Sequence, residues 1–278
     1  MDSSISQTNN TAPYQVRTHN PSTQSENRMH SDDVARQFGF KGGLVPGVTV
    51  FAHLTQPLVA RYGEAWLARG TADVSFSKPA YEGELLSIHT TDSAKGSHIL
   101  TCLNEQGVEL ARVTAALPAA AAQADVRGEI PPAPHLLERP TVTWDLMEIS
   151  KPFPALAWSP TRDENLAWCD DTRDELALYR EGTAPLLHPG LILRQANFVL
   201  RKRFIIPAWI HAASRITFFE ALRAGADYEV RAIPEEKWNH KGHEFVRLYV
   251  ALRRGQRTVA EILHTAIFRP RVRDDKQS

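Results

Sequence analysis

The sequence predicts an α+β protein made of two similar units, in each of which an antiparallel sheet wraps around one long, buried helix. Three observations support this prediction: a long apolar helix opened by Pro46, a series of strand-like segments after it, and a second copy of that order about 140 residues later. A helix that is apolar on most sides needs a covering layer, and a half-buried sheet supplies one.

A short helix and a glycine-rich loop precede the long helix. The segment Asp32–Phe38 is expected to be helical, with Ser31 or Asp32 as its N-cap and Gly39 as its end. Glycines in the loop that follows let the backbone adopt left-handed angles that other residues resist. The whole stretch reads as a polar turn, a short helix and a loop that leads into the long helix.

The long helix is expected to be buried. Pro46 suits a first helical turn because its φ angle is already fixed near the helical value, and the residues that follow, through Val59, are mostly apolar. Pro57 lies late in this run and is expected to kink the helix or to separate a short last piece.

Four segments after the long helix have the composition of β-strands. Turn-forming pairs that end in glycine separate several of them, which favours an antiparallel meander. The segments are Thr71–Ser77, Leu85–Thr91, Ile99–Leu103 and Val108–Leu117.

An ordered series of matches indicates that this unit is duplicated. Glu26, Asn27 and His30 recur as Glu164, Asn165 and Trp168; Asp32-Asp33 as Asp170-Asp171; Pro46-Gly47 as Pro189-Gly190; Trp66 as Trp209; Val74-Ser75-Phe76 as Ile216-Thr217-Phe218; and Gly83 as Gly225. The second unit is then expected to have its central helix over Pro189–Phe204 and strands through Phe268, with one hairpin lengthened near Lys237–Glu244.

The loop residues of the first unit resemble a known family. His30 followed by Asp32, then Gly39-Phe40, then a small-residue loop ending Leu44-Val45-Pro46-Gly47, looks like the hot-dog fold and in particular like the MaoC-like enoyl-CoA hydratases and dehydratases. That group carries a motif of the form D-x-N-P-x-H-x-D. The resemblance covers most of residues 15 to 118, and it implies a tandem, or double, hot-dog fold for the duplicated chain.

The expected organisation follows from the duplication. It comprises a disordered N-terminus over 1–13, a first hot-dog domain over 14–118, a linker over 119–140, a second hot-dog domain over 141–270 and a charged tail over 271–278. Two such units can join their sheets edge to edge, which removes two exposed edges. The resemblance implies the same internal pseudo-dimer, and it leaves a further homodimer open.

Composition limits the functions to consider. The chain has 32 basic and 32 acidic residues, so nothing in its charge favours nucleic acid or an anionic membrane surface as a partner. Two cysteines, Cys102 and Cys169, suggest a reducing compartment rather than a disulfide framework. Without a long apolar run or a leader, the sequence predicts a cytoplasmic protein.

His30 is the first candidate catalytic residue. Addition of water to an enoyl thioester needs a base for the water and an acid for the α-carbon, and an imidazole titrates near neutral pH. Asn27 is expected to position the water or hold the loop, and Ser25 or Glu26 to hydrogen-bond that water. By resemblance, His30 matches the catalytic histidine of the family.

The chain departs from the family motif at the aspartate. That position, five residues before the histidine, is Ser25 here, and Glu26 next to it is a candidate replacement or a structural cap. In the second copy Asp163 holds the aspartate position, but Trp168 replaces the histidine. Neither copy keeps the full pair.

The oxyanion site is expected at the start of the long helix. Gly47 and Val48 offer free backbone N–H groups and the positive end of the helix dipole to an oxygen that gains charge. Gly43 and Val45, in the loop just before, complete the predicted substrate-binding residues.

Other motifs are interpreted as structural. His188 aligns with a family histidine that precedes the helix and is read as a helix-terminal residue. His240 and His243 lie in a predicted hairpin turn with no third ligand of matching type, so no metal is predicted. The basic run Arg201–Arg203 suits a helix C-terminus and has coenzyme A phosphates as a second interpretation. No dinucleotide or phosphate-loop motif is present, so no cofactor is predicted.

The sequence therefore predicts a hydro-lyase that binds an acyl thioester, on coenzyme A or an acyl-carrier protein, in a tunnel between the two units. Two alternatives remain. One is an acyl-CoA thioesterase in which Glu26 or His30 drives water onto the carbonyl, and the other is a catalytically silent acyl-thioester-binding protein.

Overall fold

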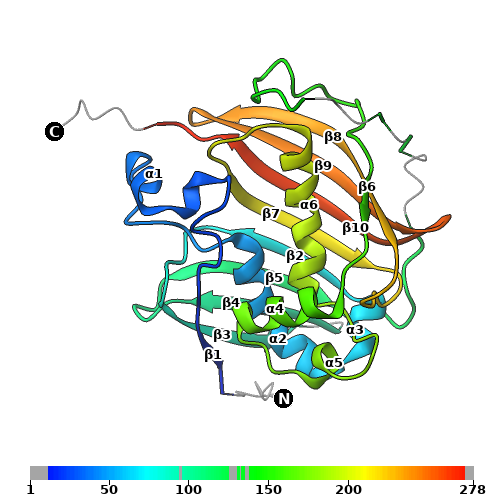
Figure 1. Ribbon diagram of the computed structural model, residues 1–278. Helices are drawn as coiled ribbons and strands as arrows, with labels where there is room; N and C mark the ends of the chain where they lie inside the picture. Colours follow the sequence, from blue (N-terminus) through cyan, green and yellow to red (C-terminus); the bar gives the residue numbers. More distant parts are fainter. Residues whose placement is uncertain (1–11, 94–95, 125–129, 132, 135–137, 273–278) are drawn as a thin grey trace, which may run out of the picture.

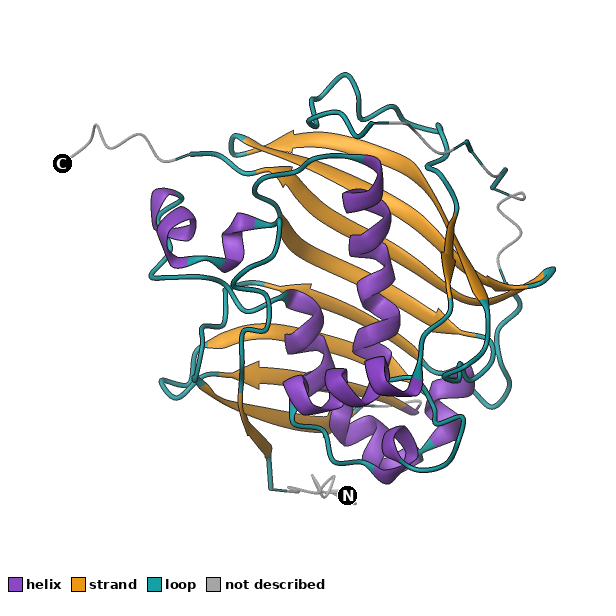
Figure 2. Ribbon diagram, in the orientation of Figure 1, coloured by secondary structure: helices purple, strands orange, loops and turns teal. Residues whose placement is uncertain are grey.

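The computed structural model describes residues 12–93, 96–124, 130–131, 133–134 and 138–272. Its strands form one antiparallel sheet in the order β1-β3-β4-β5-β2-β7-β10-β9-β8-β6, and the helices lie against one face of that sheet (Figures 1 and 2). Most of the expected disordered N-terminus, parts of the predicted linker and most of the charged tail lie outside the described residues.

The first half of the sheet contains the predicted meander only over β3, β4 and β5, because β2 pairs with β5 and β7 rather than with β3. Its strands are β1 (Tyr14–Arg17), β2 (Thr71–Phe76), β3 (Leu85–Asp92), β4 (Ser97–Leu103) and β5 (Glu109–Ala116). Its helices are the 3₁₀ turn η1 (Arg28–His30), α1 (Asp32–Gln37), α2 (Gly47–Tyr62) and α3 (Glu64–Arg69). β1 was not expected from the sequence, because four residues are too few to show a period.

Pro57 does not divide the long helix. α2 continues through it to Tyr62 and ends at Gly63, whose φ of 57° suits glycine. Ten residues of α2 are buried, as the apolar sequence predicts. The surrounding core therefore holds the helix together across the one missing backbone donor.

The second half repeats the arrangement with longer strands. Its strands are β6 (Leu156–Trp158), β7 (Ile210–Phe218), β8 (Tyr228–His240), β9 (His243–Arg254) and β10 (Arg257–Arg269). Its helices are α4 (Arg162–Thr172), α5 (Ala177–Arg180) and α6 (Pro189–Arg203). The lengthened hairpin predicted near residues 237–244 is the β8–β9 turn, where His240 pairs with His243.

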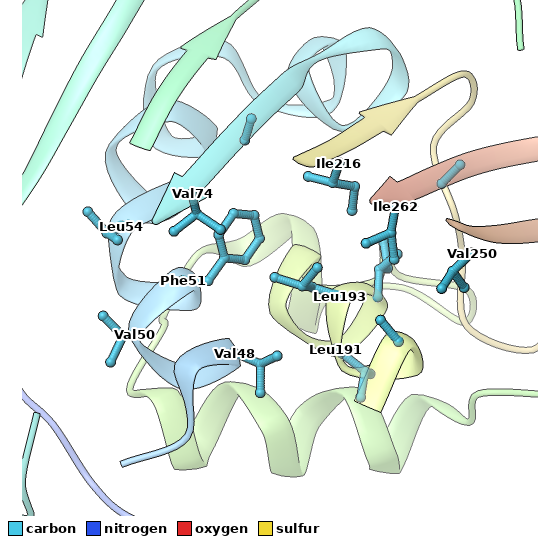
Figure 3. Close-up of a cluster of buried hydrophobic side chains, with 14 of the residues drawn as sticks. Val48, Val50, Phe51, Leu54, Val74, Leu191, Leu193, Ile216, Val250 and Ile262 are labelled. Carbon is cyan, nitrogen blue, oxygen red and sulfur yellow. The ribbon is translucent and has the colours of Figure 1, made fainter. Parts of the chain in front are cut away.

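The two halves meet at β2 and β7, which pair antiparallel with Ala72 opposite Ile216. α2 and α6 lie side by side over this joint (Figure 1), and Gly190 allows their close approach, since a Cβ there would lie 3.0 Å from the Val48 carbonyl oxygen. Figure 3 shows Phe51, Val74, Leu193 and Ile216 packed between the helices and the sheet. One apolar core is thus shared by both halves.

Candidate active site

Asn27 ties the predicted motif loop to the second half of the chain. Its side-chain nitrogen donates to the Trp209 carbonyl oxygen (3.0 Å), and its side-chain oxygen accepts from the Trp209 amide (3.1 Å). The same oxygen accepts from the Met29 amide, which caps the η1 turn. Because Asn27 is buried and both ends of its amide are used, its orientation is fixed.

His30 is held by two hydrogen bonds. Its Nδ1 lies 2.7 Å from the Leu44 carbonyl oxygen and its Nε2 lies 3.1 Å from the side-chain nitrogen of Asn27. A carbonyl oxygen only accepts, so Nδ1 carries the proton and Nε2 presents a lone pair. Burial lowers the pKa of His30, the bond to Leu44 opposes this, and the charge of Arg201 lowers the pKa further. The imidazole is therefore a neutral base at neutral pH.

Glu26 does not face His30. Its carboxylate forms two hydrogen bonds with Arg139 (2.9 and 3.1 Å) and lies 3.7 Å from Arg201. Those contacts lower its pKa, with the Arg139 bond first. The expectation that a shift in the turn brings Glu26 into the aspartate's place is wrong, because two cations hold the carboxylate on the outside of the loop. Glu26 is also not a helix cap, although Glu164 is one in a capping box with Thr161.

Ser25 lies on the inner side of the loop. Its hydroxyl donates to the Asn27 carbonyl oxygen (3.2 Å), and its side chain lines a cavity together with His30. Ser25 and His30 therefore share one wall of that cavity.

Two cavities meet at His30. One has a volume of about 250 Å³ and the other about 460 Å³. Residues from both halves line both of them: Asn27, His30, Pro46, Asn197 and Trp209. The smaller cavity is mainly apolar, with Met29, Phe40 and Val50 among its walls. The larger one also has charged walls, including Asp171, Arg194 and Arg201.

The start of α2 opens into the same cavities. Gly47 lines the smaller cavity and Val48 the larger one. Among the described residues neither amide N–H has a hydrogen-bond partner, whereas the Thr49 and Val50 amides donate to the Pro46 carbonyl oxygen. Two free donors at the positive end of a helix suit an oxygen that gains negative charge.

Gly43 and Val45 do not supply such donors. The Val45 amide donates to the Ala80 carbonyl oxygen (2.9 Å), and the Gly43 amide donates to a carboxylate oxygen of Asp32 (2.8 Å). Gly43 has a packing role instead, since a Cβ there would lie 2.2 Å from the backbone oxygen of His30. Val45 remains a wall of the smaller cavity.

Sequence reasoning missed the second half's contribution to the site. Asn197 of α6 lines the larger cavity, and its buried side-chain oxygen has no hydrogen-bond partner among the described residues. The same is true of the hydroxyl of Thr49, a residue of the first half that lines the same cavity. Asp171, at the end of α4, is the one carboxylate among the described residues that line the two cavities, and burial raises its pKa. The internal repeat marks Asp171 only as the match of Asp33, and nothing in the local sequence assigns any of these residues to the site, because the fold alone brings them to the cleft.

The corresponding place in the second half is closed. Nδ1 of His188 accepts hydrogen bonds from the Gly190 amide (3.0 Å) and from Nε1 of Trp168 (3.2 Å), and its Nε2 lies 3.2 Å from an Asp174 carboxylate oxygen. The start of α6 is therefore capped by a buried side chain. His188 has the structural geometry that the sequence predicted.

No group of three or more potential metal ligands occurs among the described residues, His240 and His243 included. Within the same residues, no helix combines the length and apolar character that crossing a bilayer requires.

Comparison with known proteins places the fold. No family model matches the chain, and no curated protein matches its sequence. A protein described as a MaoC domain dehydratase, from Chloroflexus aurantiacus, has a TM-score of 0.65 and 12% identity over 94% of each chain. A conserved hypothetical protein from Mycobacterium tuberculosis, described as having a double hotdog fold, has a TM-score of 0.57 and 13% identity over 92% of this chain and 96% of the other.

A protein described as an oleoyl thioesterase, from Lactobacillus plantarum, has a TM-score of 0.51 and 10% identity, over 95% of this chain and 98% of that one. At such identities the likeness establishes the fold alone. The chain has the double hot-dog fold that the sequence predicted. Solved structures of MaoC-like dehydratases share this fold, which supports the resemblance first drawn from the motif loop.

Proposed function

We propose that this protein binds an acyl thioester in the cleft between its two halves and catalyses its hydration or the reverse dehydration. One observation carries the proposal: a neutral, oriented histidine and the uncapped start of a buried helix open into the same pair of cavities. The smaller, apolar cavity suits an acyl chain, and the larger, more polar one suits the pantetheine arm of coenzyme A or a carrier protein.

The residues divide the chemistry between them. A water molecule displaces the Asn27 N–H from Nε2 of His30 and gives its proton to that nitrogen as its oxygen bonds to the β-carbon. The imidazolium that forms returns a proton to the α-carbon. The Gly47 and Val48 amides stabilise the negative charge on the thioester oxygen while the enolate exists. Asn27 keeps the ring oriented and donates to Nε2 in the resting protein.

The family carboxylate has no counterpart beside His30, and this raises a second candidate function. A thioesterase uses the same cavity, helix start and histidine to direct water at the carbonyl carbon, and a hot-dog protein described as a thioesterase shares the fold. In the hydratase reaction, Asp171 is the candidate for a second acid–base group, since it lines the larger cavity with His30.

Incubation with crotonyl-CoA separates the candidates. The absorbance of the conjugated thioester and the release of free thiol are followed together, with butyryl-CoA binding measured by calorimetry. Loss of conjugation without thiol supports the hydratase, and thiol release supports the thioesterase. Tight binding with neither reaction indicates a silent binding protein, and absence of binding rejects the proposal.

A further inference from the structure

A buried pair of histidines, His211 and His264, lies at the smaller cavity, and His211 lines that cavity together with His30. Nε2 of His211 is 2.7 Å from the Ser214 hydroxyl oxygen, which is 3.0 Å from Nδ1 of His264. The two rings are 4.4 Å apart between centroids, and all three side chains are buried. The serine thus links the two imidazoles into one hydrogen-bonded chain.

A β-bulge aims His211 into this chain. β7 and β10 pair in regular register from Phe218 to Ala213, whose partner is Thr265. The next residue of β10, Ala266, pairs with His211 rather than with Ala212. Ala212 is therefore an extra residue, and it reverses the alternation of side chains along the strand. Without the bulge, His211 and Ser214 would point to opposite faces, because they are three residues apart.

His211 faces the proposed oxyanion site. It lines the smaller cavity with Gly47, and a Cβ on Gly47 would lie 2.9 Å from its Nδ1. That Nδ1 is buried and has no hydrogen-bond partner among the described residues. A buried ring nitrogen without a partner, in contact with the first residue of the helix, suits a ligand group that forms a hydrogen bond.

The chemistry of that ligand group decides which tautomer His211 adopts. A hydroxyl both donates and accepts, so Ser214 can serve either tautomer. A thioester oxygen only accepts, so it selects the form with the proton on Nδ1. The chain is then complete, because His264 donates from Nδ1 to Ser214 and Ser214 donates to Nε2 of His211.

We propose that His211 is a further catalytic residue, whose Nδ1–H donates a hydrogen bond to the thioester carbonyl oxygen beside the Gly47 and Val48 amides. Ser214 and His264 are positioning residues that hold this tautomer. The inference rests on the proposed function, since it takes an acyl thioester as the ligand.

The surroundings keep this donor neutral. Burial lowers the pKa of His211 well below its ordinary value, the neighbouring His264 acts in the same direction, and a backbone contact at Ala213 opposes them. The pKa of His264 falls to about 3 through burial. A neutral imidazole can polarise a carbonyl without adding a positive charge to the cavity. The other basic side chains that line this cavity are His30, Lys78 and His243.

Infrared spectroscopy of bound, carbonyl-labelled butyryl-CoA tests the proposal, because this saturated thioester has no double bond to hydrate. The wild type should shift the carbonyl stretch to lower frequency. His211→Phe should lose part of that shift, and His211→Asn, which keeps a nitrogen donor, should recover some of it. With crotonyl-CoA, His211→Phe should lower kcat by about 10²–10³-fold with little change in KM.

Ser214→Ala keeps the ring and tests the tautomer. Nitrogen-15 NMR of labelled histidine should show Nδ1–H on His211 in the butyryl-CoA complex of the wild type, with that state depleted in Ser214→Ala. His98→Asn, a buried histidine on β4 away from both cavities, is the matched control and should keep the wild-type shift. Circular dichroism establishes that each variant is folded.

The outcomes separate the two proposals. Binding with an unchanged carbonyl shift in folded His211→Phe overturns the role of His211 and leaves the proposed function standing. Failure of the wild type to bind butyryl-CoA overturns both.

Discussion

At the scale of single residues, the site depends on a few side chains that several hydrogen bonds hold in place. Asn27 satisfies four hydrogen bonds at once, two of them to the backbone of Trp209 in the other half. The orientation of His30 follows from Asn27 and Leu44. If Asn27 were replaced by a side chain that left the buried Trp209 amide without an acceptor, the folded protein would lose on the order of 1–3 kcal/mol of stability.

Replacement of His30 by alanine should lower turnover of the thioester by roughly 10²–10⁴-fold, because it removes the general acid–base group. The fold should persist, since the ring is at the edge of a cavity. Steady-state kinetics with crotonyl-CoA measures the change, and His89→Ala, at an exposed position on β3, is the control. Turnover equal to the wild type would remove His30 from the mechanism.

Replacement of Ser25 by aspartate should raise hydratase turnover, because it returns a carboxylate to the inner side of the loop where Ser25 now lines the cavity with His30. The rate of loss of the conjugated thioester measures the effect. A decrease instead would show that the serine itself takes part in a different reaction.

At the scale of elements, the glycine-rich loop brings the η1 turn against the start of α2. Gly43 allows this contact because a Cβ would meet the His30 backbone oxygen at 2.2 Å, and no side-chain movement relieves a backbone clash. Gly42 is different. A Cβ there would meet an Asp32 carboxylate oxygen at 2.9 Å, and that side chain can move.

Gly43→Ala should therefore destabilise the protein by a few kcal/mol, on the order expected for overpacking of a core, and should displace His30. Gly42→Ala is the matched control and should cost clearly less. Urea unfolding of both variants measures the difference. Equal stability of the two would mean that the loop is free to move away from η1.

At the scale of the whole molecule, the β2–β7 joint and the shared core make one unit in which several histidines are fully enclosed. His53 of α2 lies 3.1 Å from the Thr18 hydroxyl and is buried, and burial brings its pKa to about 3. His264 has a similar pKa for the same reason. Both are neutral when folded and titrate normally when unfolded.

Stability should therefore fall in mild acid. Above about pH 6.5 these histidines are neutral in both states, and the full stability is present. As the pH falls below 6.5, the unfolded chain binds protons that the folded chain rejects until about pH 3. Each histidine lowers the unfolding free energy by about 1.4 kcal/mol per pH unit over that range.

Urea unfolding at a series of pH values from 7.5 downward measures this slope. His53→Gln should reduce the slope of unfolding free energy against pH by about 1.4 kcal/mol per pH unit, the contribution of one proton, because glutamine does not titrate. A stability that does not change between pH 7 and pH 5 would contradict the burial of neutral histidines.

The sequence by itself determined the elements and their duplication. α2, α6 and the four strands β2 to β5 follow from apolar period, helix-start prolines and glycine turns, all of which act within a few residues. His30, the start of α2 and the gap at the aspartate were also readable, because one continuous loop carries them.

Only the tertiary structure decided which groups face the cleft. Glu26 turns outward because Arg139 and Arg201 hold it, and both lie far along the chain. Asn197, Asp171 and His211 reach the cavities from the second half, and His211 does so through a bulge that strand alternation does not reveal. Local sequence patterns report which face of an element is apolar. They carry no information on long-range ion pairs or on the register between strands, and those contacts decided the site.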